Sequence, residues 1–168
     1  MEYMFLPLKR YAEFSGRSRR MEYWLWTLFL FLLWMAFLVV IVAVAGAALM
    51  GGGTNPVASI MAMGGGILII AALAFLVWLA FLIPTLAVGV RRLHDTERSG
   101  WWLGGLILLD IVNAIVRSSM GGAVAMITSL ALVVLAITLL VFYCLDGTKG
   151  PNKYGPDPKG GVNAEVFA

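Results

Sequence analysis

The sequence predicts an all-α membrane protein, a bundle of four transmembrane helices with both termini in the cytoplasm. Composition is the first observation behind this fold class: apolar residues make up 61% of the 168 residues and charged residues only 12%, about half the charged share of a soluble globular chain. The second is a series of long apolar runs separated by short polar blocks. The third is the position of the 12 lysines and arginines, because all but Arg117 lie in blocks that four alternating helices would place on one side.

Three apolar runs are long enough to cross the bilayer core as helices, which takes about 20 residues each. They cover residues 23–45, 67–90 and 123–145, and a helix in lipid satisfies its own backbone polar groups. The first run exceeds the core of a cleaved signal peptide, about 7–15 residues, so we interpret it as an uncleaved anchor. A fourth run, residues 101–116, is shorter and contains Asp110. By itself it fits either a short span or a re-entrant element.

The basic residues decide between these alternatives, because cytoplasmic loops carry an excess of Lys and Arg. If residues 101–116 cross the membrane, the N-terminal segment 1–22, the loop after residue 90 and the tail 146–168 all lie in the cytoplasm. If these residues were re-entrant, the lysines of the tail would emerge on the outside. We therefore expect four spans in one membrane domain, residues 1–168, in the inner membrane of a bacterium.

The segments outside the spans carry further signals. Pro84 removes a backbone donor and should bend the second helix near its cytoplasmic end. Residues 46–66 contain no charge and are expected at the outer interface, where Asn55-Pro56 is typical of a turn or a helix start. An interfacial helix is expected around residues 8–13. The tail is too rich in proline to be helical, and it is predicted to form a stiff strap against the arginines, with a free tail as the alternative.

Three polar blocks flank the predicted cytoplasmic face. They read FSGRSRRMEYW at residues 14–24, RRLHDTERSGWW at residues 91–102 and GTKGPNKYGPDP at residues 147–158. Together they resemble a large bacterial family known as domain of unknown function 805, the YhaH-like inner-membrane proteins, and the middle block is the most specific of the three. The resemblance implies a multi-pass inner-membrane protein and no known activity.

The arginines of these blocks suggest two kinds of site. Grouped guanidinium groups suit bidentate recognition of phosphate, so they are candidate contacts for anionic lipid headgroups. The candidate contacts are Arg17, Arg20, Arg91, Arg92 and His94. The alternative is that the arginines act as anchors in an internal ion-pair network that joins helix ends. The predicted members of that network are Glu22, Asp95, Arg98 and Asn152. On a continuous helix Asp95 lies at i+4 from Arg91 and three residues before Arg98, which are spacings that favour pairing.

The sequence favours a protein that is not an enzyme. His94 and Asp95 are adjacent, so on a helix they point about 100° apart and are poorly placed to act as a pair. One histidine with no second ligand at helical spacing does not predict a metal site, and the single Cys144 excludes an internal disulfide. We expect no cofactor, no metal and no nucleic-acid partner, because the basic residues form short clusters and no long basic face. An enzyme that acts on lipid is the least favoured alternative.

Asp110 and Asn113 are polar residues inside a predicted span. Asp110 lies about 14 Å along the helix from Trp101, at about 1.5 Å per residue, and a carboxyl at that depth is costly and typically functional. We expect a structural clip in which Asp110 pairs through Asn113 and the hydroxyls of Thr128 or Ser129. The alternative is a path for an ion, a proton or a solute, which in so small a protein would require an oligomer.

The sequence therefore predicts a non-enzymatic membrane scaffold or accessory protein whose cytoplasmic arginine cluster binds anionic lipid or a partner. The expected partners are the lipid bilayer, including anionic phospholipid, and either a second copy or another membrane protein. The alternative function is a small transporter or channel subunit that uses Asp110.

Overall fold

The computed structural model describes residues 2–51, 56–119 and 122–160. Its helices are α1 (Glu2–Lys9), α2 (Arg20–Gly51), α3 (Pro56–Asp95), α4 (Trp101–Ser119) and α5 (Gly122–Cys144). Helices α2 to α5 are long and apolar enough to cross a membrane. The predicted all-α fold with four membrane helices is therefore confirmed.

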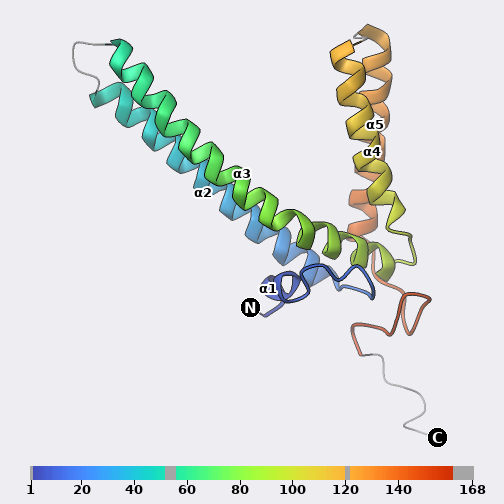
Figure 1. Cartoon of the computed structure of the whole chain (residues 1–168). Coiled ribbons are helices and arrows are strands. Elements are labelled where there is room, and N and C mark those ends of the chain that lie inside the picture. Colours follow the sequence, from blue (N-terminus) through green and yellow to red (C-terminus); the bar gives the residue numbers. More distant parts are fainter. Residues whose placement is uncertain (1, 52–55, 120–121, 161–168) are drawn as a thin grey trace, which may run out of the picture.

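The four long helices form two hairpins. Helix α2 packs against α3, and α4 packs against α5. The two hairpins meet at one end and diverge from it, and the N-terminal segment and the described part of the tail lie at that shared end (Figure 1). Large hydrophobic side chains are exposed along all four helices, as lipid requires. Helix α4 is the least apolar of the four by mean hydropathy.

Helices α2 and α3 extend well beyond the apolar runs from which they were predicted. Helix α2 continues to Gly51, and α3 begins at Pro56, which agrees with a helix start at that proline. Proline is common at the first helical position because its fixed φ suits the helix and its missing N–H has no helical partner there. Asn55, the other half of the predicted signal, lies outside the described residues. Where the bilayer begins and ends along these helices stays a prediction.

The short N-terminal helix lies earlier in the chain than the sequence suggested. It covers Glu2–Lys9, so the prediction of a helix at residues 8–13 was wrong. The reason is a tertiary contact, because the backbone carbonyls of Arg10 and Glu13 accept hydrogen bonds from Arg91 Nη1 at 3.2 and 2.6 Å. Those carbonyls point toward α3, and the chain turns there.

Pro84 lies inside α3 and explains how the N-terminal segment docks. A proline has no N–H to donate to the carbonyl four residues earlier, which here belongs to Ala80. The hydroxyl of Tyr11 donates to that carbonyl at 2.6 Å. One residue after the proline, Thr85 Oγ1 accepts a hydrogen bond from the indole of Trp26 on α2 at 3.1 Å. The segment before α2 and α2 itself are thus both bound to α3 near Pro84.

A small core joins the two hairpins at their shared end. Leu93 of α3 packs with Leu139 and Tyr143 of α5, and all three are buried. The ring of Tyr23 on α2 stacks on Tyr143 with the centroids 4.3 Å apart. Leu93 belongs to the middle polar block, so this cluster packs directly against that block.

Candidate functional site

Five charged residues are buried where the hairpins meet, and we call them the arginine junction. They are Arg17, Arg91, Arg92, Glu22 and Asp95. Arg91 and Arg92 have no exposed surface, so each guanidinium needs partners within the protein, because a buried unpaired charge is very costly.

Arg91 connects α3 to the segment before α2. Its Nη2 pairs with Glu22 Oε1 at 2.9 Å, and its Nε donates to Ser18 Oγ at 2.9 Å. Its Nη1 donates to the carbonyls of Arg10 and Glu13. The main chain adds a further link, since Ser18 N donates to the carbonyl of Arg91 at 3.1 Å. All three nitrogens of this guanidinium are therefore bound inside the chain.

Asp95 bridges the other two arginines, using one carboxylate oxygen for each. Arg17 Nε donates to Oδ1 at 2.9 Å, and Arg92 Nη1 donates to Oδ2 at 2.5 Å. The tail approaches this carboxylate so closely that a Cβ on Gly147 would overlap it. Only glycine fits there without moving the ion pair.

The end of α5 supplies the negative charge that the junction lacks. Three buried arginines face only two buried carboxylates, and backbone carbonyls at a helix C-terminus carry partial negative charge. Arg92 Nε donates to the carbonyl of Tyr143 at 3.2 Å, and its Nη2 donates to that of Leu145. Arg20 Nη1 donates to the carbonyl of Cys144 at 3.2 Å. Two arginines from other helices therefore cap α5.

The described part of the tail is bound as a strap over the junction. Arg17 donates to the carbonyls of Thr148 and Gly150 at 2.5 and 2.6 Å, and Arg19 donates to that of Pro158 at 2.5 Å. The backbone N–H groups of Lys159 and Gly150 donate to the carboxylate of Asp157. These bonds hold the pKa of Asp157 below its usual 3.8. The predicted strap is present up to residue 160, and residues 161–168 lie outside the described part.

His94 and Asn152 attach the strap to α3. Asn152 Nδ2 donates to the carbonyl of His94 at 3.0 Å, and the ring of Tyr154 stacks on the imidazole, 3.9 Å apart and nearly parallel. His94 Nδ1 lies 3.2 Å from the carbonyl of Gly16, so this nitrogen carries a proton. The ammonium of Lys153 lies over the Tyr154 ring, at the exposed side of the stack.

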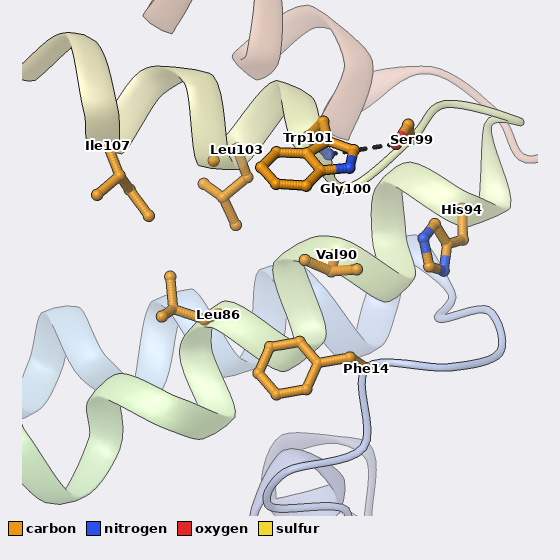
Figure 2. Close-up of a pocket in the computed structure, with 10 residues that line it drawn as sticks. Phe14, Leu86, Val90, His94, Ser99, Gly100, Trp101, Leu103 and Ile107 are labelled. Carbon is orange, nitrogen blue, oxygen red and sulfur yellow. Dashed lines mark hydrogen bonds between the residues drawn. The ribbon is translucent and has the colours of Figure 1, made fainter.

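A cleft of about 600 Å³ opens between α3 and α4 beside this stack. Figure 2 shows Leu86 and Val90 of α3 facing Leu103 and Ile107 of α4, with His94 at one end. The rest of the lining is formed by Phe14, Ser99, Gly100, Trp101 and Gly104. The cleft is thus apolar along the helices and polar only where it reaches the junction.

The two polar residues of α4 have different surroundings. Asn113 is buried, and its Oδ1 accepts hydrogen bonds from Thr128 Oγ1 at 2.8 Å and Ser129 Oγ at 3.0 Å. Asp110 is exposed on the outer surface of α4. The clip between α4 and α5 that the sequence predicted therefore exists through Asn113, and Asp110 is not part of it.

Comparisons with known proteins place the chain in a family. The family model described as a protein of unknown function (DUF805) matches residues 11–156. The chain belongs to the DUF805 family. The inner membrane protein YhaI of Escherichia coli K12 is 35% identical over 163 residues, which cover 97% of this chain and 100% of the relative. The inner membrane protein YhaH of the same strain is 31% identical and covers 95% of this chain and 98% of the relative. No solved structure matches the chain significantly.

The family resemblance seen in the sequence is therefore confirmed, and with it a multi-pass protein of the bacterial inner membrane. All three blocks that carry the resemblance lie at the arginine junction of this DUF805 protein. The first supplies Arg17 and Glu22, the second Arg91 to Asp95, and the third the strap.

The structure divides the predicted headgroup contacts into two groups. Arg17, Arg91 and Arg92 are buried and bound inside the protein, as in the ion-pair network that the sequence left as the alternative. Arg20 is half-exposed, with a pair to the exposed Asp146 at 2.7 Å, and His94 is partly exposed beside the cleft. Lipid binding stays a prediction for these two residues.

Two predicted pairs of the network are wrong. Arg91 pairs with Glu22 in place of Asp95, because Asp95 already bridges Arg17 and Arg92. Arg98 is directed toward α5, where its guanidinium lies 3.7 Å from the centre of the Phe142 ring. Glu97 has a positive φ of 60°, so the helix has ended there and the helical spacing from Asp95 to Arg98 does not apply.

Sequence reasoning also missed several functional groups of the junction. Ser18 and the carbonyls of Tyr143 and Leu145 bind buried guanidinium nitrogens. Ser18 lies inside the first block, so its place in that block was the available signal. A backbone carbonyl leaves no trace in a sequence. Among the described residues, no three His, Cys, Asp or Glu side chains are placed to hold a metal ion.

Proposed function

We propose that this protein is a non-enzymatic scaffold of the inner membrane that holds anionic phospholipid beside a rigid junction on the cytoplasmic side. One observation carries the proposal, the contrast between two sets of basic residues. Every nitrogen of the three buried guanidinium groups donates to an acceptor of the chain itself. Arg20, Lys149 and Lys153 are exposed at the same end of the molecule.

The buried set supports the scaffold part of the proposal. A buried ion pair is retained only when further hydrogen bonds satisfy its remaining groups, and removing one partner is strongly destabilising. Here the pairs connect the N-terminal segment, the end of α3, the end of α5 and the strap. Such a junction fixes both hairpins without any external ligand.

The cleft and the exposed set support the lipid part. The cleft continues the lipid-facing surfaces of α3 and α4, and an acyl chain suits its apolar lining. A phosphate at its polar end would lie near the His94–Tyr154 stack, beyond which the Lys153 ammonium extends. Arg20 is a second exposed cation at the same end of the molecule, beside the end of α5. Exposed basic residues near a membrane attract anionic lipids by about 1 kcal/mol each, and the same residues favour a cytoplasmic orientation of this face.

The acyl-chain site is tested by filling the cleft. Ile107→Trp places a large ring in the lining, whereas Leu108→Trp makes a similar change at the neighbouring position, which is exposed outside it. Native mass spectrometry of the purified protein counts the phospholipids that remain bound. We expect Ile107→Trp to lose a bound phospholipid that Leu108→Trp keeps. Equal lipid binding by both variants and the wild type would reject the site.

The headgroup contacts are tested by charge removal. Arg20→Gln and Lys153→Gln should lower the ratio of anionic to zwitterionic phospholipid among the bound molecules, because each removes an exposed cation from the end of the molecule that carries the junction. Lys9→Gln, an exposed lysine in the N-terminal helix, is the control. An unchanged ratio in both test variants would leave the scaffold without lipid selectivity.

The alternative of a small transporter or channel subunit rests on Asp110. In a single chain that carboxyl lies on the outer surface of α4, so a path along it would need at least two chains. Ion or proton flux in proteoliposomes that Asp110→Asn abolishes at unchanged stability would favour this alternative.

A further inference from the structure

Helix α4 carries a polar stripe, of which Asn113 is buried against α5 and the other members are exposed. A shallow groove of about 410 Å³ follows this stripe and is lined by Asp110, Asn113, Ala114, Arg117 and Ser118. These positions recur every three or four residues, so they follow one face of the helix. Helices α2 and α5 have no charged residue in the middle of their spans, so this face is different in kind from the other surfaces that meet lipid.

The carboxyl of Asp110 needs a partner that the single chain does not provide. Asn113 Oδ1 is occupied by the hydroxyls of α5. Among the residues that the structure describes, none donates a hydrogen bond to Asp110. Ionisable groups within a membrane almost always face other protein or a water-filled cavity, because hydrocarbon leaves them unsatisfied. The outer face of α4 is therefore expected to be covered.

We infer that a second copy of this chain covers it, with the two α4 helices packed about a two-fold axis along the membrane normal. Both copies insert in the same orientation, because the same basic residues orient them. The axis then brings the two Asp110 residues together at equal depth. Two carboxyl groups that share a proton form a donor–acceptor pair, so the two Asp110 side chains can satisfy each other. A two-fold interface needs this kind of self-complementary surface.

The neighbouring residues suit a close approach of two helices. Ala114 and Ser118 are small and lie one and two turns beyond Asp110 on the same face, and small residues let membrane helices pack closely. Arg117 lies about 10 Å further along the helix than Asp110. Its long side chain can therefore reach the polar boundary between membrane and water. A lipid tail offers no hydrogen bond to Asp110, and a different protein would have to bring a polar group to the same depth.

Disulfide crosslinking tests the inferred dimer in native membranes. In a Cys144→Ser background, Ala114→Cys places a thiol on the proposed interface. Val112→Cys is the control, because it lies at nearly the same depth on an exposed position about 160° around the helix. Mild oxidation should give a disulfide-linked dimer with Ala114→Cys and little with Val112→Cys. Equal dimer yields, no dimer from Ala114→Cys, or a crosslink to a protein of another mass would each overturn the inference.

Substitution of Asp110 then tests the role of the carboxyl. Two amides can also bond to each other, so Asp110→Asn should keep the Ala114→Cys crosslink, whereas Asp110→Leu should weaken dimerisation about three- to tenfold. Thermal stability of the monomer in detergent controls for folding, because the clip through Asn113 does not involve Asp110. A crosslink that is unchanged in Asp110→Leu would contradict the pairing. The outcome of this experiment is independent of the proposed lipid site, which lies between α3 and α4.

Discussion

Replacing Arg91 with alanine removes the donor of four acceptors, of which only the carbonyl of Arg10 keeps a second donor among the described residues, Glu13 N. They are Ser18 Oγ, the carbonyls of Arg10 and Glu13, and the carboxylate of Glu22. Water can reach the two carbonyls, because the segment that carries them is exposed on its outer side. Glu22 is different, since only 3% of its surface is exposed and its charge would stay buried without a cation.

The expected loss follows from this burial. Removing one partner of a buried ion pair costs about 3–5 kcal/mol, because the other charge is left uncompensated. A second ion pair lies nearby, in which Arg10 Nη2 is 2.7 Å from Glu13 Oε1 and the two side chains are 29% and 43% exposed. Surface pairs of this kind contribute about 0–1 kcal/mol. We therefore expect Arg91→Ala to lower the free energy of unfolding by about 3 kcal/mol more than Arg10→Ala does.

The free energy of unfolding can be measured in mixed micelles by titration with a denaturing detergent, for both variants and the wild type. A third protein, Arg91→Ala combined with Glu22→Gln, should regain part of the loss, because it removes the buried charge. The reasoning is refuted if Arg91→Ala costs no more than Arg10→Ala, or if Glu22→Gln gives no recovery.

Three further predictions concern the strap and the N-terminal segment. Gly147→Ala should detach the strap and raise its protease sensitivity, because a Cβ would overlap Asp95; proteolysis that matches the wild type would contradict this. Tyr11→Phe should lower the free energy of unfolding by about 1 kcal/mol through the lost bond to Ala80, and no change by denaturant titration would contradict it. Backbone N–H groups lower the pKa of Asp157, so its carboxylate stabilises the docked strap above about pH 4, and this stabilisation is lost as the pH falls through the lowered pKa. Hydrogen exchange of the strap amides should therefore rise at that pH in the wild type and rise less in Asp157→Asn.

The membrane helices were predictable because lipid imposes a simple rule on the sequence. A run of about 20 apolar residues satisfies it regardless of what the helix touches. The one ambiguous run was assigned by charge, and it forms α4. The three prolines of the tail predicted that it forms no helix, but the sequence left a docked strap and a free tail as alternatives, because backbone carbonyls hold it in place.

The pairing within the junction was not predictable, because it depends on contacts between segments far apart in the chain. Helical spacing suggested Asp95 as the partner of Arg91, but Arg17 comes from another segment and occupies that carboxylate. The position of α1 was missed for the same reason. The orientation of Asp110 also required the structure, because α5 packs against the face of α4 that carries Asn113.

The buried arginines bind the chain to itself, and we propose that phospholipid binds outside the junction. A high-resolution map of the protein purified with its native lipids tests this most directly. We predict continuous density for an acyl chain in the cleft between α3 and α4, and guanidinium groups of Arg91 and Arg92 that contact only protein. Headgroup density on those two arginines, with Glu22 or Asp95 turned away from them, would contradict the account.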